Sequence, residues 1–208
     1  MKEFFSEVIE GVEGDNPLTG AVSALKSAGV LSRTNRTDPA KGIYESDTGQ
    51  LLLNAPSHQL RVITPRLEGA CLDSQTASGP VRLGKLTIES TSVPGSVTAI
   101  AVDDRPLDES RRILLVYATD ALNSGMTFSS PERETLVALG GLPVLLRTGQ
   151  LKVTLTGRHA ASLKVWALGL DGRRAEVVAA AAKGETLAVA VDTGRLKGVT
   201  PFFEMVAE

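Results

Sequence analysis

Cysteine, aromatic residues and a surplus of charge of either sign are all scarce in this sequence. Cys71 is the only cysteine, so no disulfide can form within the chain. Its place in the alternating stretch 67–72 predicts a core thiol. The 22 Lys and Arg residues nearly balance 24 Asp and Glu residues, for a net charge of −2. This balance lacks the basic surplus that drives nucleic-acid binding, so we expect no nucleic-acid partner.

Long apolar runs are missing as well. No stretch approaches the roughly 18 apolar residues that cross a bilayer, so we expect no membrane partner. Residues 1–5 lack the basic and apolar regions of a signal peptide. The protein is therefore expected to be cytoplasmic, or else secreted or periplasmic if the chain is a piece of a larger enzyme.

The residues that are present fit a globular protein rich in turns. The chain has 208 residues, of which 42 % are hydrophobic, enough to bury a core without disulfide or metal support. Twenty glycines together with only 4 % aromatic residues are typical of a β protein with side chains of modest size.

The first 42 residues predict a short helical extension and a linker. Apolar residues recur at helical spacing near the start of the chain, at Phe4, Phe5, Val8, Ile9 and Val12. A second helix is expected over residues 18–28, with Gly29 at its C-terminal cap. Residues 32–42 are polar, aperiodic and contain Pro and Gly, which indicates a linker or surface loop.

From about residue 43 the period changes to two, and a dozen short strands are separated by turn residues. No helical segment long enough for a parallel crossover lies between them, which favours an antiparallel β-sandwich over residues 43–208. The expected strands are 50–53, 59–64, 67–72, 81–89, 96–102, 112–119, 136–139, 144–147, 150–156, 162–168, 174–180 and 186–191, with a terminal strand over 202–206.

Alternation also predicts which way side chains point. In residues 163–168, Lys164 marks its own set as solvent-facing, so Trp166 is expected to lean outward. Residues 112–119 are apolar on both faces, which predicts a central or covered strand, and the N-terminal helices are one candidate cover. Asp171-Gly172 between two alternating runs predicts a hairpin with a type I′ turn.

Few motifs point to chemistry. Asp-Thr-Gly occurs at residues 47–49 and 192–194, as it does twice in aspartic proteases, but the flanking residues are those of turns. His58 and His159 have no second ligand at metal spacing, so we expect no metal site and no cofactor. Trp166 and Tyr44 are the best candidates for stacking on a sugar ring.

Three segments resemble the C-terminal β-sandwich domain that follows the catalytic barrel in some bacterial glycoside hydrolases. The first joins Ser46-Asp47-Thr48-Gly49 to Thr64-Pro65-Arg66, the second joins Pro106-Leu107 to Ser110-Arg111-Arg112 and Asn123-Ser124-Gly125, and the third joins Pro143-Val144 to Trp166-Ala167-Leu168. The resemblance covers roughly residues 43–180. Leu53-Asn54 stands where that family commonly has Trp-Asp, and Asp104-Arg105 where it has Asp-Gly.

The resemblance implies a non-catalytic accessory module of a carbohydrate-active enzyme, with a catalytic (β/α)-barrel domain or a polysaccharide as its partner. We expect no turnover from this chain alone. One alternative is an independent carbohydrate-binding module that uses Trp166 and Tyr44. A more remote alternative is an aspartic-type protease built on the two Asp-Thr-Gly triplets.

Overall fold

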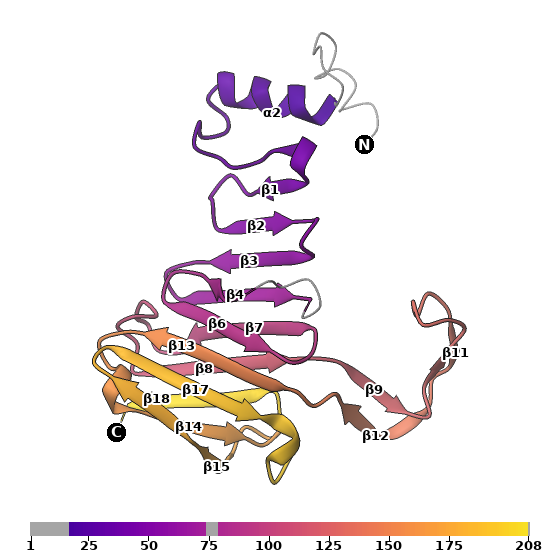
Figure 1. Cartoon of the computed structure of the whole chain (residues 1–208), viewed down its shortest axis with the longest axis vertical. Coiled ribbons are helices and arrows are strands. Elements are labelled where there is room, and N and C mark those ends of the chain that lie inside the picture. The colour runs from indigo at the N-terminus through magenta and orange to yellow at the C-terminus, as the bar shows by residue number, and fades with distance from the viewer. Residues whose placement is uncertain (1–16, 74–78, 208) are drawn as a thin grey trace.

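The alternation after residue 43 gives two antiparallel sheets that pack face to face in the computed structural model (Figure 1). The structure describes residues 17–73 and 79–207. The predicted class, a mainly β antiparallel sandwich with a short N-terminal helix, is confirmed. Of the two predicted helices, the second is α2 (Pro17–Ser27), followed by Gly29 at φ +74°, and the first lies outside the described residues.

The larger sheet has nine strands and contains the first strands of the chain. Their order across the sheet is β1 (Ile43–Glu45), β2 (Leu51–Asn54), β3 (Gln59–Ile63), β4 (Leu67–Leu72), β7 (Gly95–Ala101), β8 (Arg112–Ala118), β18 (Phe202–Ala207), β14 (Leu163–Leu168) and β15 (Arg174–Val178). The doubly apolar strand β8 lies between β7 and β18, so the prediction of a central strand is confirmed.

The smaller sheet has five strands and covers one side of the larger one. Its order is β16 (Ala180–Lys183), β17 (Thr186–Asp192), β13 (Gln150–Thr156), β6 (Leu86–Thr91) and β5 (Val81–Arg82). The single strand predicted over residues 81–89 is therefore two strands, because Leu83, Gly84 and Lys85 form a turn in which Leu83 N–H bonds to Leu86 O. Short 3₁₀ turns lie at Pro39–Lys41 (η1), Ala160–Ser162 (η2) and Thr193–Arg195 (η3).

The hydrophobic core lies between the two sheets. Every second side chain of the central strands points into it, and the largest fully buried ones include Leu115, Tyr117, Phe203, Leu155 and Leu187. This is the alternation that a half-buried strand requires. No hydrophobic residue of β1, β2 or β3 belongs to the buried core, and these strands extend beyond the two-layered part (Figure 1).

A buried carboxylate on β4 joins the two sheets. Glu68 of β4 is 4 % exposed and its Oε2 accepts backbone N–H groups from Gly84, Lys85 and Leu86, at 2.9, 2.6 and 2.8 Å. A buried polar oxygen needs hydrogen-bond donors in place of water, and these three N–H groups supply them. Glu68 therefore fixes the turn between β5 and β6 of the small sheet over the large sheet.

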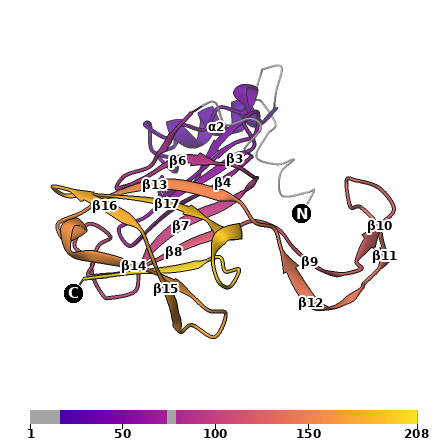
Figure 2. The same cartoon turned by 60° about the horizontal axis from the view of Figure 1, so that its bottom comes forward.

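A two-stranded arm, residues 121–146, leaves the sandwich between β8 and β13 (Figure 2). It consists of β9 (Ala121–Ser124) paired with β12 (Gly141–Leu146), and β10 (Thr127–Phe128) paired with β11 (Leu136–Ala138). Arg133 at the tip stacks on Phe128 and pairs with Asp120 at the base, at 2.8 Å, so the arm curls back on itself. The sequence analysis did not predict β9 or β10.

The hairpin predicted at Asp171-Gly172 is present as β14–β15, but its predicted turn type is wrong. Only Gly172 has a positive φ, and the connection is five residues long, closed by Gly169 N–H on Arg173 O at 2.8 Å. The register shifts between Ala167 and Leu168, and this bulge lengthens the loop beyond two residues.

Candidate functional site

The side of the nine-stranded sheet that faces away from the small sheet, here called the outer face, is apolar except for Ser96, Thr98 and four charged residues on β8, β18, β14 and β15. Side chains of directly paired residues share a face. The register therefore places on it, from β1 to β15, Tyr44, Leu51, Leu53, Leu60, Val62, Leu67, Cys71, Ile100, Leu114, Val116, Phe202, Val206, Trp166, Leu168 and Val177.

No described element covers this face. Leu51, Leu53 and Val177 are 46, 40 and 51 % exposed. The helix α2 packs on η1 beyond β1 rather than on the face, so the described helix is not the cover considered for β8 (Figure 1). Large apolar side chains gathered on one open surface are the mark of an interaction site rather than of a solvated face.

The other side of β1–β3 combines Ile43, Leu52 and Ile63 with polar side chains that are held by ion pairs and hydrogen bonds. Asn35 is buried and donates its amide to the carbonyls of Glu45 and Ser46, at 3.4 and 3.0 Å. Arg36 pairs with Glu45 at 2.6 Å. Hydrogen bonds from Arg36 lower the pKa of Glu45 against the opposing effect of burial. Residues 32–38 therefore pack against this side of β1–β3 and leave the outer face of these three strands uncovered.

Charged groups occur at one end of the outer face only. Glu204 of β18 is 5 % exposed and lies between two arginines, with Arg112 Nε at 2.7 Å and Arg174 Nε at 2.6 Å. Burial acts to raise the pKa of the Glu204 carboxyl, but hydrogen bonds from Arg174 and Arg112 outweigh it, so this pKa lies below its ordinary value. Glu204 is therefore a carboxylate at neutral pH.

Trp166 lies beside this ion pair network, as predicted on the outward side of β14. Lys164 Nζ is 4.8 Å and the Arg174 guanidinium carbon 5.5 Å from the Trp166 ring, within the range of cation–π attraction. Its indole Nε1 is buried without a hydrogen-bond partner. Two cationic side chains of the same chain therefore already contact the Trp166 ring.

The structure does not bring the two sugar-stacking candidates together. Tyr44 lies on β1 and Trp166 on β14, seven strand steps apart in the same sheet. At about 4.8 Å per step the separation is about 34 Å, far more than one sugar unit spans. They share a face but form no common aromatic platform.

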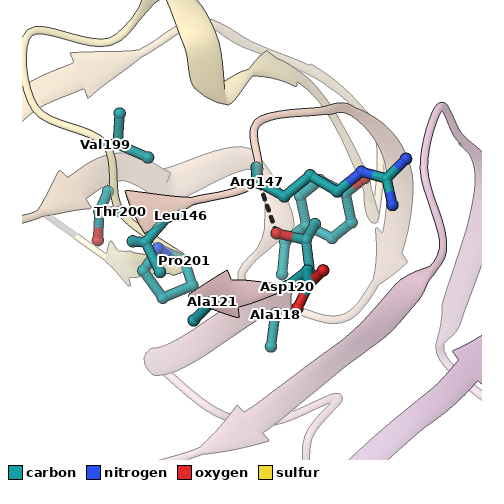
Figure 3. Close-up of a pocket in the computed structure, with 10 residues that line it drawn as sticks. Ala118, Asp120, Ala121, Leu146, Arg147, Val199, Thr200 and Pro201 are labelled. Atoms are coloured by element: carbon teal, nitrogen blue, oxygen red, sulfur yellow. Dashed lines mark hydrogen bonds between the residues drawn. The ribbon is translucent and has the colours of Figure 1, made fainter. Parts of the chain in front are cut away.

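An apolar hollow of about 220 Å³ lies where the arm leaves the sandwich (Figure 3). Ala118, Leu146, Val199 and Pro201 line it. Its polar contact, Thr119 Oγ1 to Arg147 O at 2.5 Å, is internal to the base of the arm.

The arm itself exposes large apolar side chains to solvent, at Leu136, Val137, Leu139, Leu142, Val144 and Leu145. The arm therefore carries a second exposed apolar surface.

The motifs considered for catalysis lie in turns of different sheets. Asp47 is exposed between β1 and β2 and accepts from Thr48 N–H at 2.8 Å. Asp192 ends β17 and caps η3 by accepting from Gly194 N–H at 3.0 Å. His58 lies in the turn between β2 and β3, and His159 precedes η2. Within residues 17–73 and 79–207, no three His, Cys, Asp or Glu side chains gather as metal ligands would.

The prediction for Cys71 is wrong, because this thiol is exposed on the outer face instead of buried in the core. Alternation placed it in a strand, but position 71 belongs to the set that faces away from the small sheet. The sequence analysis also missed Arg112, Arg174 and Glu204 as a cluster. Their pairs span 92 and 30 residues, which local patterns do not reveal.

No protein-family model matches this chain, and no curated protein or solved structure matches it. None of the described helices is long and apolar enough to cross a membrane.

Proposed function

We propose that this chain is a non-catalytic β-sandwich module that packs against and supports the catalytic domain of a carbohydrate-active enzyme. The observation that carries the proposal is the apolar outer face, which runs across all nine strands without a covering layer in the described residues. A sheet buries its apolar faces against another layer. The resemblance to the sandwich domains of glycoside hydrolases supplies the kind of partner.

The protease alternative has less support, because Asp47 and Asp192 accept backbone hydrogen bonds in separate turns of different sheets and do not form a pair. The polysaccharide-binding alternative has less support. Its best aromatic residue, Trp166, is half-buried with two cations against its ring, and Tyr44 is about 34 Å away.

Two measurements test the proposal. The chain alone is screened on aryl-glycosides and common polysaccharides, where we expect no hydrolysis. A hydrolysis that disappears when one carboxylate is replaced would refute the non-catalytic role.

The second measurement mixes the chain with the separately purified catalytic domain that is encoded in the same or the adjoining reading frame. We expect a complex by sedimentation and a higher melting temperature for the catalytic domain. If no complex forms and the melting temperature does not move, the accessory role is wrong. Native gels through soluble polysaccharides test the alternative, since retardation lost in Trp166→Ala would favour it.

A further inference from the structure

We infer that the two-stranded arm joins this chain to a second copy of itself, by pairing β12 of one copy with β12 of the other across a two-fold axis. The arm strands belong to sheets separate from the nine-stranded sheet, so this pairing goes beyond the proposed function and does not depend on the outer face. Three properties of the arm point to it: the composition of its second half, the free edge of β12 and the hollow at its base.

The first property is composition. Residues 135–146 contain no Asp, Glu, Lys or Arg. Their large side chains are nevertheless in solvent, since Val137, Leu142 and Val144 are 66, 87 and 51 % exposed. A two-stranded ribbon is only marginally stable in water unless it packs on a further layer or strand. The composition of the arm therefore indicates that it packs on a partner.

The second property is the free edge of β12. In the part of the chain that the structure describes, β12 pairs with β9 on one edge and with no strand on the other. Arg147 N–H bonds to Asp120 O at 2.8 Å, so the backbone groups of Arg147 face the β9 side. Backbone groups alternate between the two edges of a strand, so those of Val144 and Leu146 point to the free edge. They are available to pair with another strand.

This edge lacks the usual protection against pairing. Natural proteins guard open sheet edges with charged side chains or with proline. Gly141–Leu146 carries no charge. Its proline, Pro143, turns its carbonyl to the β9 side, where it accepts from Ser124 Oγ at 2.7 Å, so the free edge stays uninterrupted at Val144.

The free edge is also complementary to itself. A two-fold axis runs two identical strands antiparallel, so each residue lies opposite the residue equally far beyond the axis. With the axis at Val144, this residue meets its own copy, and Leu142 lies opposite Leu146 of the second copy. Every facing pair is apolar, and no like charges meet.

The third property is the apolar hollow at the base of the arm (Figure 3). Leu146 lines this hollow, so the axis at Val144 brings Leu142 of each copy to the hollow of the other. The register with β9 shifts between Gly141 and Val144, and an irregularity of this kind re-aims a side chain such as Leu142. A hollow of about 220 Å³ is smaller than the roughly 300–1,000 Å³ of small-molecule pockets, and it suits one apolar side chain.

A second copy is favoured over a different protein because this chain supplies both halves of the contact. The protruding Leu142 and the hollow at Leu146 are four residues apart, at most about 13 Å of extended backbone, so one axis satisfies both. A different protein would have to supply an uncharged edge strand and a side chain for the hollow. The arm extends away from the two packed sheets, which leaves its edge accessible (Figure 1, Figure 2).

The contact is small. Six residues of β12 give about 20 Å of paired strand, so the pairing with its two filled hollows lies at the lower end of specific interfaces. We therefore expect a dimer that dissociates on dilution.

Self-association of the whole 208-residue chain is measured by sedimentation velocity over a range of concentrations, where we expect a monomer–dimer equilibrium. Val144→Lys places two like charges at the axis and should raise the dissociation constant about tenfold or more. Val177→Lys is the matched control, because Val177 is also 51 % exposed on an edge strand but lies on the outer face. It should stay within about twofold of the unchanged chain. Circular dichroism establishes that both variants are folded.

Cross-linking tests the same axis without adding charge. In a Cys71→Ser background, Val144→Cys brings two thiols together where facing Cα atoms lie about 5.5 Å apart, a separation that a disulfide spans. We expect copper phenanthroline to link Val144→Cys chains about ten times faster or more than the equally exposed Val177→Cys chains. Equal rates would contradict an axis at Val144.

Three other results would overturn the pairing. The first is a chain that stays monomeric at every concentration. The second is a dimer that Val177→Lys disrupts and Val144→Lys does not, which would join the copies through the outer face. The third is a monomeric chain whose complex with the catalytic domain is weakened by Val144→Lys, which would assign the arm to that domain. A dimer that binds no catalytic domain would instead refute the proposed function and leave the pairing standing.

Discussion

The two sides of this sandwich that face away from the core differ in chemistry although both belong to the same fold. The outer side of the five-stranded sheet, here called the polar face, carries Lys152, Thr154, Thr87, Glu89, Arg82, Ala188 and Ala190. The outer face of the nine-stranded sheet carries leucine, valine, isoleucine, tyrosine and tryptophan, with charges at one end only. The polar face is suited to water, and the outer face to a second protein layer.

An apolar side chain in this molecule is therefore not necessarily a core side chain. Leu114 and Leu115 are neighbours in β8, and both are apolar, yet Leu115 is fully buried between the sheets and Leu114 lies on the outer face. If the outer face awaits a partner, its side chains should matter little for the folding of the chain alone and much for association.

The largest expected effect compares these two neighbours. Leu115→Ala removes a side chain from the closed core and should lower the free energy of unfolding by about 3 kcal/mol. Leu114→Ala should lower it by about 1 kcal/mol or less, because that side chain already touches solvent. Urea unfolding followed by circular dichroism measures both. Equal losses would mean that part of the chain already covers the outer face.

A second pair compares carboxylates on different sides of the sheets. Glu68→Ala leaves three N–H groups of the β5–β6 turn without their acceptor and should cost about 2 kcal/mol. Glu89→Ala on the polar face breaks a hydrogen bond from Thr154 and should cost less than about 1 kcal/mol. The same unfolding measurement applies, and a larger loss in Glu89→Ala would contradict the role of Glu68 in joining the sheets.

The ion pair network of the outer face should make stability depend on pH. The pKa of Glu204 is lowered in the folded chain from its ordinary value of 4.5. Its stabilising contribution is therefore fully present above about pH 4.5 and is lost as pH falls through the lowered value. Unfolding at pH 7 and near pH 3 should differ less in Glu204→Gln than in the unchanged chain. An identical difference in both would exclude Glu204 as a source of acid sensitivity.

The smallest expected effect on stability comes from making the outer face polar. Leu53→Thr with Val62→Thr should change the free energy of unfolding by less than about 1 kcal/mol, since neither residue belongs to the buried core. The same change should reduce the fluorescence of an apolar dye such as anilinonaphthalene sulfonate, because it removes part of the exposed apolar area. Ala188→Thr with Ala190→Thr on the polar face is the control and should leave the dye signal unchanged.

Local alternation was sufficient for much of the fold. Lys164 identified the outward set of β14 correctly, so Trp166 lies outward while Val165 is buried. Alternation failed where it had to decide which of the two sides of a strand faces the core. Cys71 lies in the strand that was predicted, but the pattern of residues 67–72 does not reveal which side the second sheet covers.

The candidate site was harder to predict than the strands. The motif search singled out Trp166 and Tyr44 one residue at a time, and their separation across seven strand steps became visible only from the strand order. Arg112, Arg174 and Glu204 carry no motif, and they meet because β8, β18, β14 and β15 are neighbours in the sheet.

By itself the sequence determined that the chain after residue 43 forms short antiparallel strands, because a period of two is a local property of extended backbone. Only the tertiary structure decided which apolar side received the second sheet and which stayed open. That choice depends on pairings such as β4 with β7 and β8 with β18, whose partners lie far apart along the chain. Such pairings are set by the packing of the whole domain, which no short window of residues contains.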